Sequence, residues 1–126
     1  MIELTDISLT LDDGDLFSGL NLTVGKGEKV AISGESGSGK TTLLNCIGCI
    51  DTPTAGTVRV GGREIAKLKD KQITDIRLHK IGFIFQTFNL IPVLNALENV
   101  EFPLLLMKKY SKAEVRRKAE KLIDET

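Results

Sequence analysis

The sequence predicts an α/β fold, in which short antiparallel strands precede a strand–loop–helix unit and a helix closes the chain. Three observations support this prediction. Apolar and polar residues alternate over residues 2–11 and again over residues 20–24, which is the period of half-buried strands. A glycine-rich loop at residues 34–41 lies between an apolar run and a segment without helix breakers. A Ser-x-x-Glu capping pattern opens residues 111–126.

Composition is that of one soluble globular domain, with 126 residues, of which 41% are hydrophobic and 27% charged. The formal net charge is zero, so bulk electrostatics gives no reason to expect nucleic acid or an anionic membrane as partner. The first residues lack the basic and apolar regions of a signal peptide, and the apolar runs are too short to cross a bilayer. We therefore expect a cytosolic protein, or one attached to a membrane through another chain.

The first elements are predicted to be strands. Residues 2–11 alternate, with a slip of phase between Leu4 and Ile7, and alternation returns from Leu20 to Val24. Residues 12–15 form a turn, whose aspartates we assign to turn chemistry rather than to a metal. After a Gly-Lys-Gly turn at 25–27, the chain enters the apolar strand 29–33, so we expect a β-meander that feeds the glycine-rich loop.

The loop itself reads G-x-x-x-x-G-K-[ST], the pattern of a phosphate-binding loop. Its glycines let successive backbone N–H groups face one concavity, and the helix predicted from Thr41 to Ile47 offers its positive end to an anion. Lys40 supplies a charge for the β- and γ-phosphates, and Thr41 supplies a hydroxyl for Mg²⁺. The alternative, a flexible Gly/Ser linker, fits poorly between an apolar strand and an apolar helix. The predicted phosphate-binding residues are Gly34, Glu35, Ser36, Gly37, Ser38, Gly39, Lys40 and Thr41.

The only two cysteines, Cys46 and Cys49, have the spacing C-x-x-C. A redox pair would sit at a helix start, and a zinc site would need two further ligands, whereas the sequence has one histidine, His79. We interpret the cysteines as small buried hydrophobes. His79 is assigned to the surface.

The middle of the chain continues the α/β pattern. Residues 57–60 form a β-branched strand, and Gly61-Gly62 a hairpin turn. Ile73 and Ile76 suggest a surface helix within 63–80. Residues 81–86 are apolar at all but two positions and predict a buried strand that ends in Gln86. A side chain at that end can contact a metal or an attacking water, or belong to an ordinary loop.

Residues 87–107 carry many apolar residues for a loop, either as core or as an exposed patch for a partner. Ser111 and Glu114 then open a helix whose apolar face is Val115, Ala119, Leu122 and Ile123. The basic opposite face is assigned to solvent rather than to nucleic acid.

Taken together, several stretches resemble the nucleotide-binding domain of ABC transporters over essentially all 126 residues. The stretches are 27–44, 51–56, 80–86, 88–92 and 96–100, and the last two resemble the lipoprotein-releasing, macrolide-export and antimicrobial-peptide-resistance subgroup. The resemblance implies the P-loop NTPase core of an ABC-type ATPase, with Gly34 to Thr42 binding ATP phosphates and Mg²⁺ as the Walker A motif. Gln86 would be the Q-loop glutamine, and Gln86 and Thr41 would together bind Mg²⁺.

The resemblance also implies partners and a location. Residues after Gln86 would face a membrane-spanning permease, a second nucleotide-binding domain would complete a homodimer, and the protein would lie on the cytoplasmic face of the cell membrane. No nucleic acid is implied. Leu11 stands where the family has an aromatic residue that stacks on adenine, so Phe17 and Tyr110 are candidates to replace it.

Other family motifs are absent from residues 1–126: the Leu-Ser-Gly-Gly-Gln signature, the strand ending in Asp-Glu (Walker B) and the switch histidine. Asp124-Glu125 imitates that ending, but it continues a helical pattern. We therefore expect about the first half of the domain, in which Lys40 and Gln86 are the catalytic-site residues present. The expected function is ATP binding in an exporter. The alternatives are a nucleotide-binding module without turnover and another P-loop enzyme, such as a small-molecule kinase.

Overall fold

The computed structural model describes residues 1–11 and 14–125, without the side chain of Leu11. The turn predicted at residues 12–15 therefore lies partly outside the described residues. The chain forms two compact units, Met1–Arg77 and Leu78–Thr126, and the boundary falls in the last turn of a helix.

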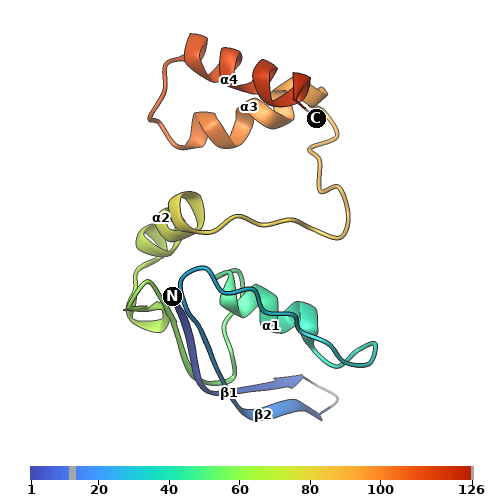
Figure 1. Cartoon of the computed structure of the whole chain (residues 1–126), viewed down its shortest axis with the longest axis vertical. Coiled ribbons are helices and arrows are strands. Elements are labelled where there is room, and N and C mark those ends of the chain that lie inside the picture. The colour runs from blue at the N-terminus through green and yellow to red at the C-terminus, as the bar shows by residue number, and fades with distance from the viewer. Residues whose placement is uncertain (12–13, 126) are drawn as a thin grey trace. The chain divides into compact units, whose positions relative to one another are not determined.

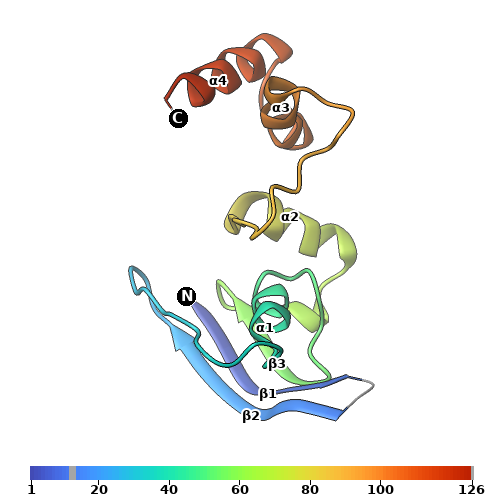
Figure 2. The same cartoon turned by 90° about the vertical axis from the view of Figure 1, so that its right-hand side faces the viewer.

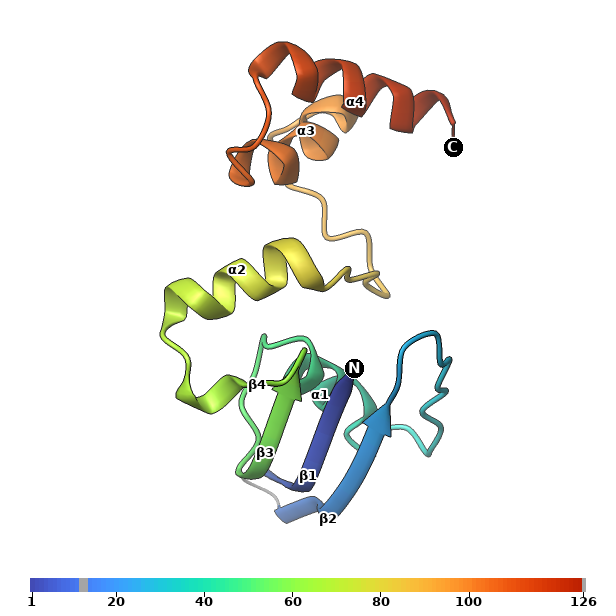
Figure 3. The same ribbon diagram turned by 60° about the vertical axis from the view of Figure 1, so that its left-hand side comes forward.

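The first unit is built on a four-stranded antiparallel sheet of order β2-β1-β3-β4. Its strands are β1 (Ile2–Leu11), β2 (Gly14–Val24), β3 (Ala55–Val60) and β4 (Arg63–Glu64). The register of β1 against β2 shifts between Leu4 and Ile7, which confirms the slip of phase that the sequence predicts. The chain leaves the sheet after β2 and returns as β3 on the other side of β1, so the sheet is not a simple meander (Figure 3).

The core of this unit lies between the sheet and α1 (Lys40–Ile47), which packs on one face of it (Figures 2 and 3). A short 3₁₀ turn, η1 (Ile65–Lys67), and α2 (Asp70–Lys80) follow the sheet. The buried apolar residues of the unit are Leu4, Ile7, Leu9, Leu43, Cys46, Cys49, Val58, Val60 and Ile76. Because these side chains leave water together on folding, they supply the hydrophobic free energy of the unit.

Both cysteines are buried, with exposed fractions of 1% for Cys46 and 4% for Cys49, as predicted for small hydrophobes. Burial raises the pKa of both thiols. Asp51 raises the pKa of Cys46 further, whereas Arg77 offsets part of the rise at Cys49. His79 is exposed, as its assignment to the surface requires.

The predicted hairpin at Gly61-Gly62 is present, and both glycines have positive φ, 57° and 77°. A two-residue turn with this backbone matches the twist of the strands that it joins.

Two predicted strands, residues 29–33 and 81–86, are wrong as secondary structure, because both segments are irregular. The prediction rested on apolar side chains, but a strand also needs a neighbour to hydrogen-bond its backbone. No strand in the described part of the chain lies beside either segment. Several of their apolar side chains are correspondingly exposed, 49% for Val30 and 100% for Ile84.

The second unit is a helical hairpin of α3 (Ala96–Leu106) and α4 (Lys112–Asp124), between which the chain doubles back (Figure 1). Both helices begin with a complete capping box, Asn95 with Glu98 and Ser111 with Glu114, of which the second was predicted. Val115 and Ala119 are buried, but Leu122 and Ile123 of the predicted apolar face stay 51% and 41% exposed. Asp124 lies in α4, which confirms its helical interpretation.

Helix α3 was missed by the sequence analysis. Its signal is the pattern Asn95-x-x-Glu98 before an apolar run, and Pro103 inside the helix obscures it. Within residues 1–11 and 14–125, none of the helices combines the length and the apolar character that a membrane crossing requires.

Candidate phosphate-binding site

The candidate site begins where the chain leaves β2 through a tight turn. The backbone N–H of Gly25 donates to the Glu28 carboxylate at 2.6 Å, and the N–H of Glu28 donates back to the carbonyl of Gly25 at 3.4 Å. The chain then runs without regular structure to the loop, which turns directly into α1. The predicted phosphate residues are therefore contiguous at the N-terminal end of α1.

Glycines are required at several points of this loop. Gly37 and Gly39 have φ of 81° and 85°, a region that other residues rarely adopt. A Cβ on Gly34 would stand 2.8 Å from the Ser38 hydroxyl oxygen. The loop thus needs Gly37 and Gly39 for their backbone conformation and Gly34 for its close approach to Ser38.

Lys40 places its ammonium group inside the loop. Its Nζ donates to the carbonyls of Gly34 at 2.9 Å and Glu35 at 2.6 Å, and lies 3.5 Å from the Ser38 hydroxyl. The cation is therefore held at the concave side of the loop by neutral oxygens, without a carboxylate partner among these bonds. An anion that enters the loop meets this charge directly.

The start of α1 adds further donors. The first helical hydrogen bond runs from the N–H of Leu43 to the carbonyl of Gly39 at 2.8 Å, so the amides of residues 40–42 have no acceptor within the helix. No side chain caps this end, and the first turn holds no acidic residue. Free amides and the positive end of the helix dipole both favour a phosphate here.

Thr41 is exposed and Thr42 half-buried at the same helix end. A hydroxyl is among the hard oxygen ligands that Mg²⁺ accepts, usually together with waters and phosphate oxygens. The donor set of residues 34–42 therefore fits a nucleotide phosphate chain, with Thr41 as the residue that would hold its magnesium.

Gln86 lies in the second unit and is exposed in the irregular segment before α3. Tyr110 belongs to the same unit and is flanked by two ammonium groups, those of Lys118 and Lys109, at 4.7 and 5.8 Å from its ring centre. The stacking position at Leu11 lies outside the described side chains.

Two side chains of β2 border the loop. An ideal Cβ on Gly39 would lie 3.0 Å from Leu16 and 3.1 Å from Phe17. Of the two aromatic candidates for the adenine, Phe17 is the one that lies in the same unit as the loop and touches it. Leu16 was missed, since only the fold brings β2 to the loop.

Asn99 was also missed. Its amide nitrogen donates to the carbonyls of Ile91, Leu94 and Asn95 at 3.3, 3.0 and 2.9 Å, and its oxygen accepts the N–H of Ile91 at 2.8 Å. It fastens the segment after Gln86 to the start of α3. That segment exposes apolar side chains, 93% of Phe88 and 88% of Val93.

Comparison with known proteins places the chain in a family. Residues 17–126 match the ABC transporter family. The lipoprotein-releasing system ATP-binding protein LolD of Geobacter metallireducens is 44% identical over 84% of this chain and 49% of its own length. The macrolide export ATP-binding/permease protein MacB of Marinobacter nauticus is 41% identical over 98% of this chain and 20% of its own.

A solved structure shows the same fold. The dimeric ATP-binding cassette MJ0796, in a post-hydrolysis state bound to ADP and Pi, superimposes with a TM-score of 0.87 at 44% identity. The match covers 96% of this chain and 55% of that one. The chain also spans about half the length of the curated ATP-binding proteins that it matches. With 110 consecutive residues matched, from 17 to 126, the chain belongs to the ABC transporter family.

Proposed function

We propose that this chain is the phosphate-binding part of an ABC exporter ATPase. The ATPase couples ATP binding and hydrolysis to transport or release of substrate by a membrane-spanning partner. The observation that carries the proposal is the Lys40 ammonium, held inside a loop of positive-φ glycines at the uncapped end of α1. MJ0796, which resembles this chain at a TM-score of 0.87, was solved with ADP and Pi.

In this function, Lys40 neutralises charge on the β- and γ-phosphates, and the amides of residues 40–42 orient them. Thr41 and Gln86 hold Mg²⁺, which when bound supplies further charge neutralisation. Gln86 also orients the attacking water. Phe17 supports the nucleobase in place of an aromatic side chain at position 11.

The same proposal assigns the partner-facing surface to residues 87–93. Their exposed apolar side chains, on a segment whose backbone Asn99 holds at Ile91, support a role in docking the permease on the cytoplasmic side of the membrane. A second nucleotide-binding domain completes the catalytic site in the homodimer. The 126 residues contain no signature sequence and no strand-borne Asp-Glu pair, so we expect this chain alone to bind Mg-ATP without sustained turnover.

Thermal unfolding with and without Mg-ATP tests the phosphate site. The ligand raises Tm because it binds the native state. Lys40→Ala removes charge-assisted contacts of about 1.5–3 kcal/mol and weakens binding roughly tenfold to a hundredfold. Lys26→Ala, in the exposed turn before the loop, is the matched control and should keep the parent shift. A Lys40→Ala protein with the parent's Mg-ATP shift would contradict the assignment.

The metal role is tested by comparing the Kd of ATP with Mg²⁺ and with EDTA. Thr41→Val and Gln86→Ala should each reduce the gain that Mg²⁺ gives, while they leave metal-free ATP binding close to the parent value. If Gln86→Ala keeps the full gain, Gln86 does not hold the metal in this chain.

A further inference from the structure

The C-terminal end of α1 is fastened by a residue that no motif identifies. After Ile47 the chain turns through Cys49, whose φ of 58° is in the left-handed region although it is not glycine. Its carbonyl oxygen accepts a hydrogen bond from Nη1 of Arg77 in α2 at 2.8 Å. The negative end of the α1 dipole also stabilises a cation at this point.

The guanidinium is itself held in place. Its Nη2 lies 3.3 Å from the hydroxyl oxygen of Thr74, one turn earlier on α2. The residue before Arg77 in the chain, Ile76, is buried in the core, with 3% of its surface exposed. Arg77 is therefore fixed at its backbone by the packing of α2 and at its head group by Thr74.

A pocket of about 310 Å³ is lined by one residue of each helix, Cys46 of α1 and Ile73 of α2, and otherwise by Val58 and residues of the segments 51–56 and 65–68. Apolar packing between the two helices is therefore not continuous at this pocket. The bond from Arg77 to Cys49 adds a directional link between α2 and the end of α1.

The other end of α1 carries the phosphate donors. The helix has eight residues, which corresponds to about 12 Å, so it moves as one rigid piece. A shift or tilt at Cys49 displaces the amides of residues 40–42 and the backbone of Lys40. Charge-assisted hydrogen bonds are short and directional, so such a displacement weakens them.

We propose that Arg77 is a positioning residue for the phosphate loop: by holding the Cys49 carbonyl it fixes the orientation of α1 and raises the affinity for Mg-ATP. This inference rests on the proposed function, since it concerns the same site. Arg77 touches neither the loop nor the phosphates and acts through α1.

The test is the Kd of Mg-ATP by calorimetry at a temperature where each protein is more than about 95% folded. There, a loss of global stability alone leaves Kd unchanged, so the readout isolates positioning. Arg77→Met should weaken binding about tenfold. Arg77→Lys, which can still donate to the carbonyl, should recover at least half of that loss on a logarithmic scale.

Arg59→Met is the matched control, because Arg59 makes an ion pair with Glu64 at 3.6 Å on the sheet and is not bonded to α1. It should bind Mg-ATP like the parent. If Arg77→Met is poorly folded, Thr74→Val frees the guanidinium from its support and should weaken binding about twofold to fivefold.

An unchanged Kd for Mg-ATP in Arg77→Met overturns the inference. If Arg77→Met folds poorly and Thr74→Val is used in its place, an unchanged Kd in Thr74→Val overturns it. So does an Arg77→Lys protein as weak as Arg77→Met. A parent chain that does not bind Mg-ATP overturns the proposed function instead.

Discussion

At the scale of single residues, the two cysteines have the same side chain and similar burial but different backbone conformations. Both are buried, but Cys46 has helical backbone inside α1, whereas Cys49 has φ of 58°. For an L-residue the left-handed region costs about 1–2 kcal/mol, and β-branched side chains tolerate it least. The same substitution should therefore have different consequences at the two sites.

We expect Cys49→Val to lower the free energy of unfolding by about 1–2 kcal/mol more than Cys46→Val. Overpacking by the extra methyl group affects both variants, so the difference reports the backbone at position 49. Urea unfolding followed by circular dichroism measures it. Equal stabilities of the two variants would show that Cys49 does not keep its positive φ.

Lys40 and Arg77 are a second pair at this scale. Both are cations whose head groups donate to backbone carbonyls, 2.6–2.9 Å for Lys40 and 2.8 Å for Arg77. Lys40 is identified by its motif, since its spacing from the glycines is local in the sequence. Arg77 is 28 residues from Cys49, and no local pattern connects the two.

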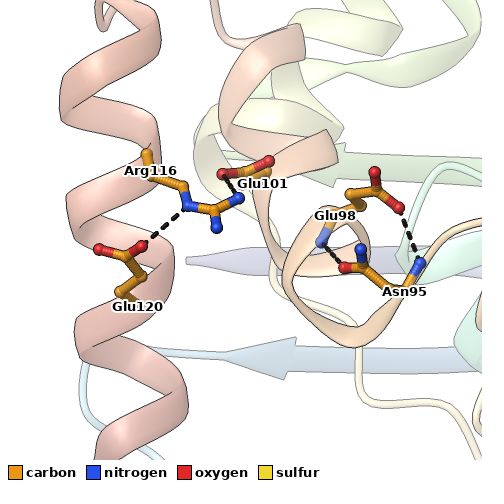
Figure 4. Close-up of polar contacts among 5 residues, drawn as sticks. All are labelled: Asn95, Glu98, Glu101, Arg116 and Glu120. Carbon is orange, nitrogen blue, oxygen red and sulfur yellow. Dashed lines mark hydrogen bonds and ion pairs between the residues drawn. The ribbon is translucent and has the colours of Figure 1, made fainter.

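At the scale of elements, capping hydrogen bonds fix where the helices of the hairpin begin. Asn95 accepts the N–H of Glu98 at 2.9 Å, and the Glu98 carboxylate accepts the N–H of Asn95 at 2.8 Å (Figure 4). Arg116 of α4 pairs with Glu120 of the same helix at 2.8 Å and, across the hairpin, with Glu101 of α3 at 3.4 Å (Figure 4). The Glu120 carboxylate, with help from Glu101, raises the pKa of Arg116.

The cap of α4 predicts a pH dependence. Hydrogen bonds from the backbone N–H and the hydroxyl of Ser111 lower the pKa of Glu114, with help from Arg117 and Lys118. A carboxyl whose pKa is lower in the folded state contributes stability above its unfolded pKa. That contribution is lost as pH falls through the folded pKa.

We therefore expect NMR titration of the Glu114 carboxyl to give a midpoint below that of a free glutamate, and Ser111→Ala to move it up towards the usual value. Protection of the α4 amides should fall over the same acidic range in the parent, and Glu114→Gln should remove this pH dependence. A Glu114 midpoint that does not respond to Ser111→Ala would contradict the capping role.

At the scale of the whole chain, apolar side chains on both sides of Gln86 are exposed to solvent. Ile84, in a segment predicted to be a buried strand, is 100% exposed, and Phe88, in a stretch predicted to be either core or an exposed patch, is 93% exposed. Exposed apolar groups of this kind are found where a protein meets a partner, and they promote association when the partner is missing.

We expect the isolated 126-residue chain to self-associate as concentration rises, with a weight-average mass above that of the 13.8 kDa monomer in light scattering. Phe88→Ser should reduce the association, because it removes most of an exposed aromatic surface. Ile50→Ser, at a 46% exposed site of the first unit, is the control. A monodisperse monomer at high concentration would contradict this expectation.

The sequence by itself determined the features whose physics is local. The tight backbone of the glycine-rich loop, the hairpin turn at Gly61-Gly62, the slip of phase in β1 and the capping box at Ser111 each depend on residues a few positions apart. Backbone conformation and nearby hydrogen bonds decide them. The helical state of Asp124 follows from the same local pattern.

Tertiary structure decided what depends on distant partners. Strand formation at residues 29–33 and 81–86 needs a neighbouring strand, and side-chain pattern alone does not supply one. The return of β3 beside β1, the approach of Phe17 to Gly39 and the bond from Arg77 to Cys49 join residues that the sequence separates widely. Only folding brings such groups within contact distance, so the glycine-rich loop was readable in the sequence, but the residues that pack against it and against α1 were not.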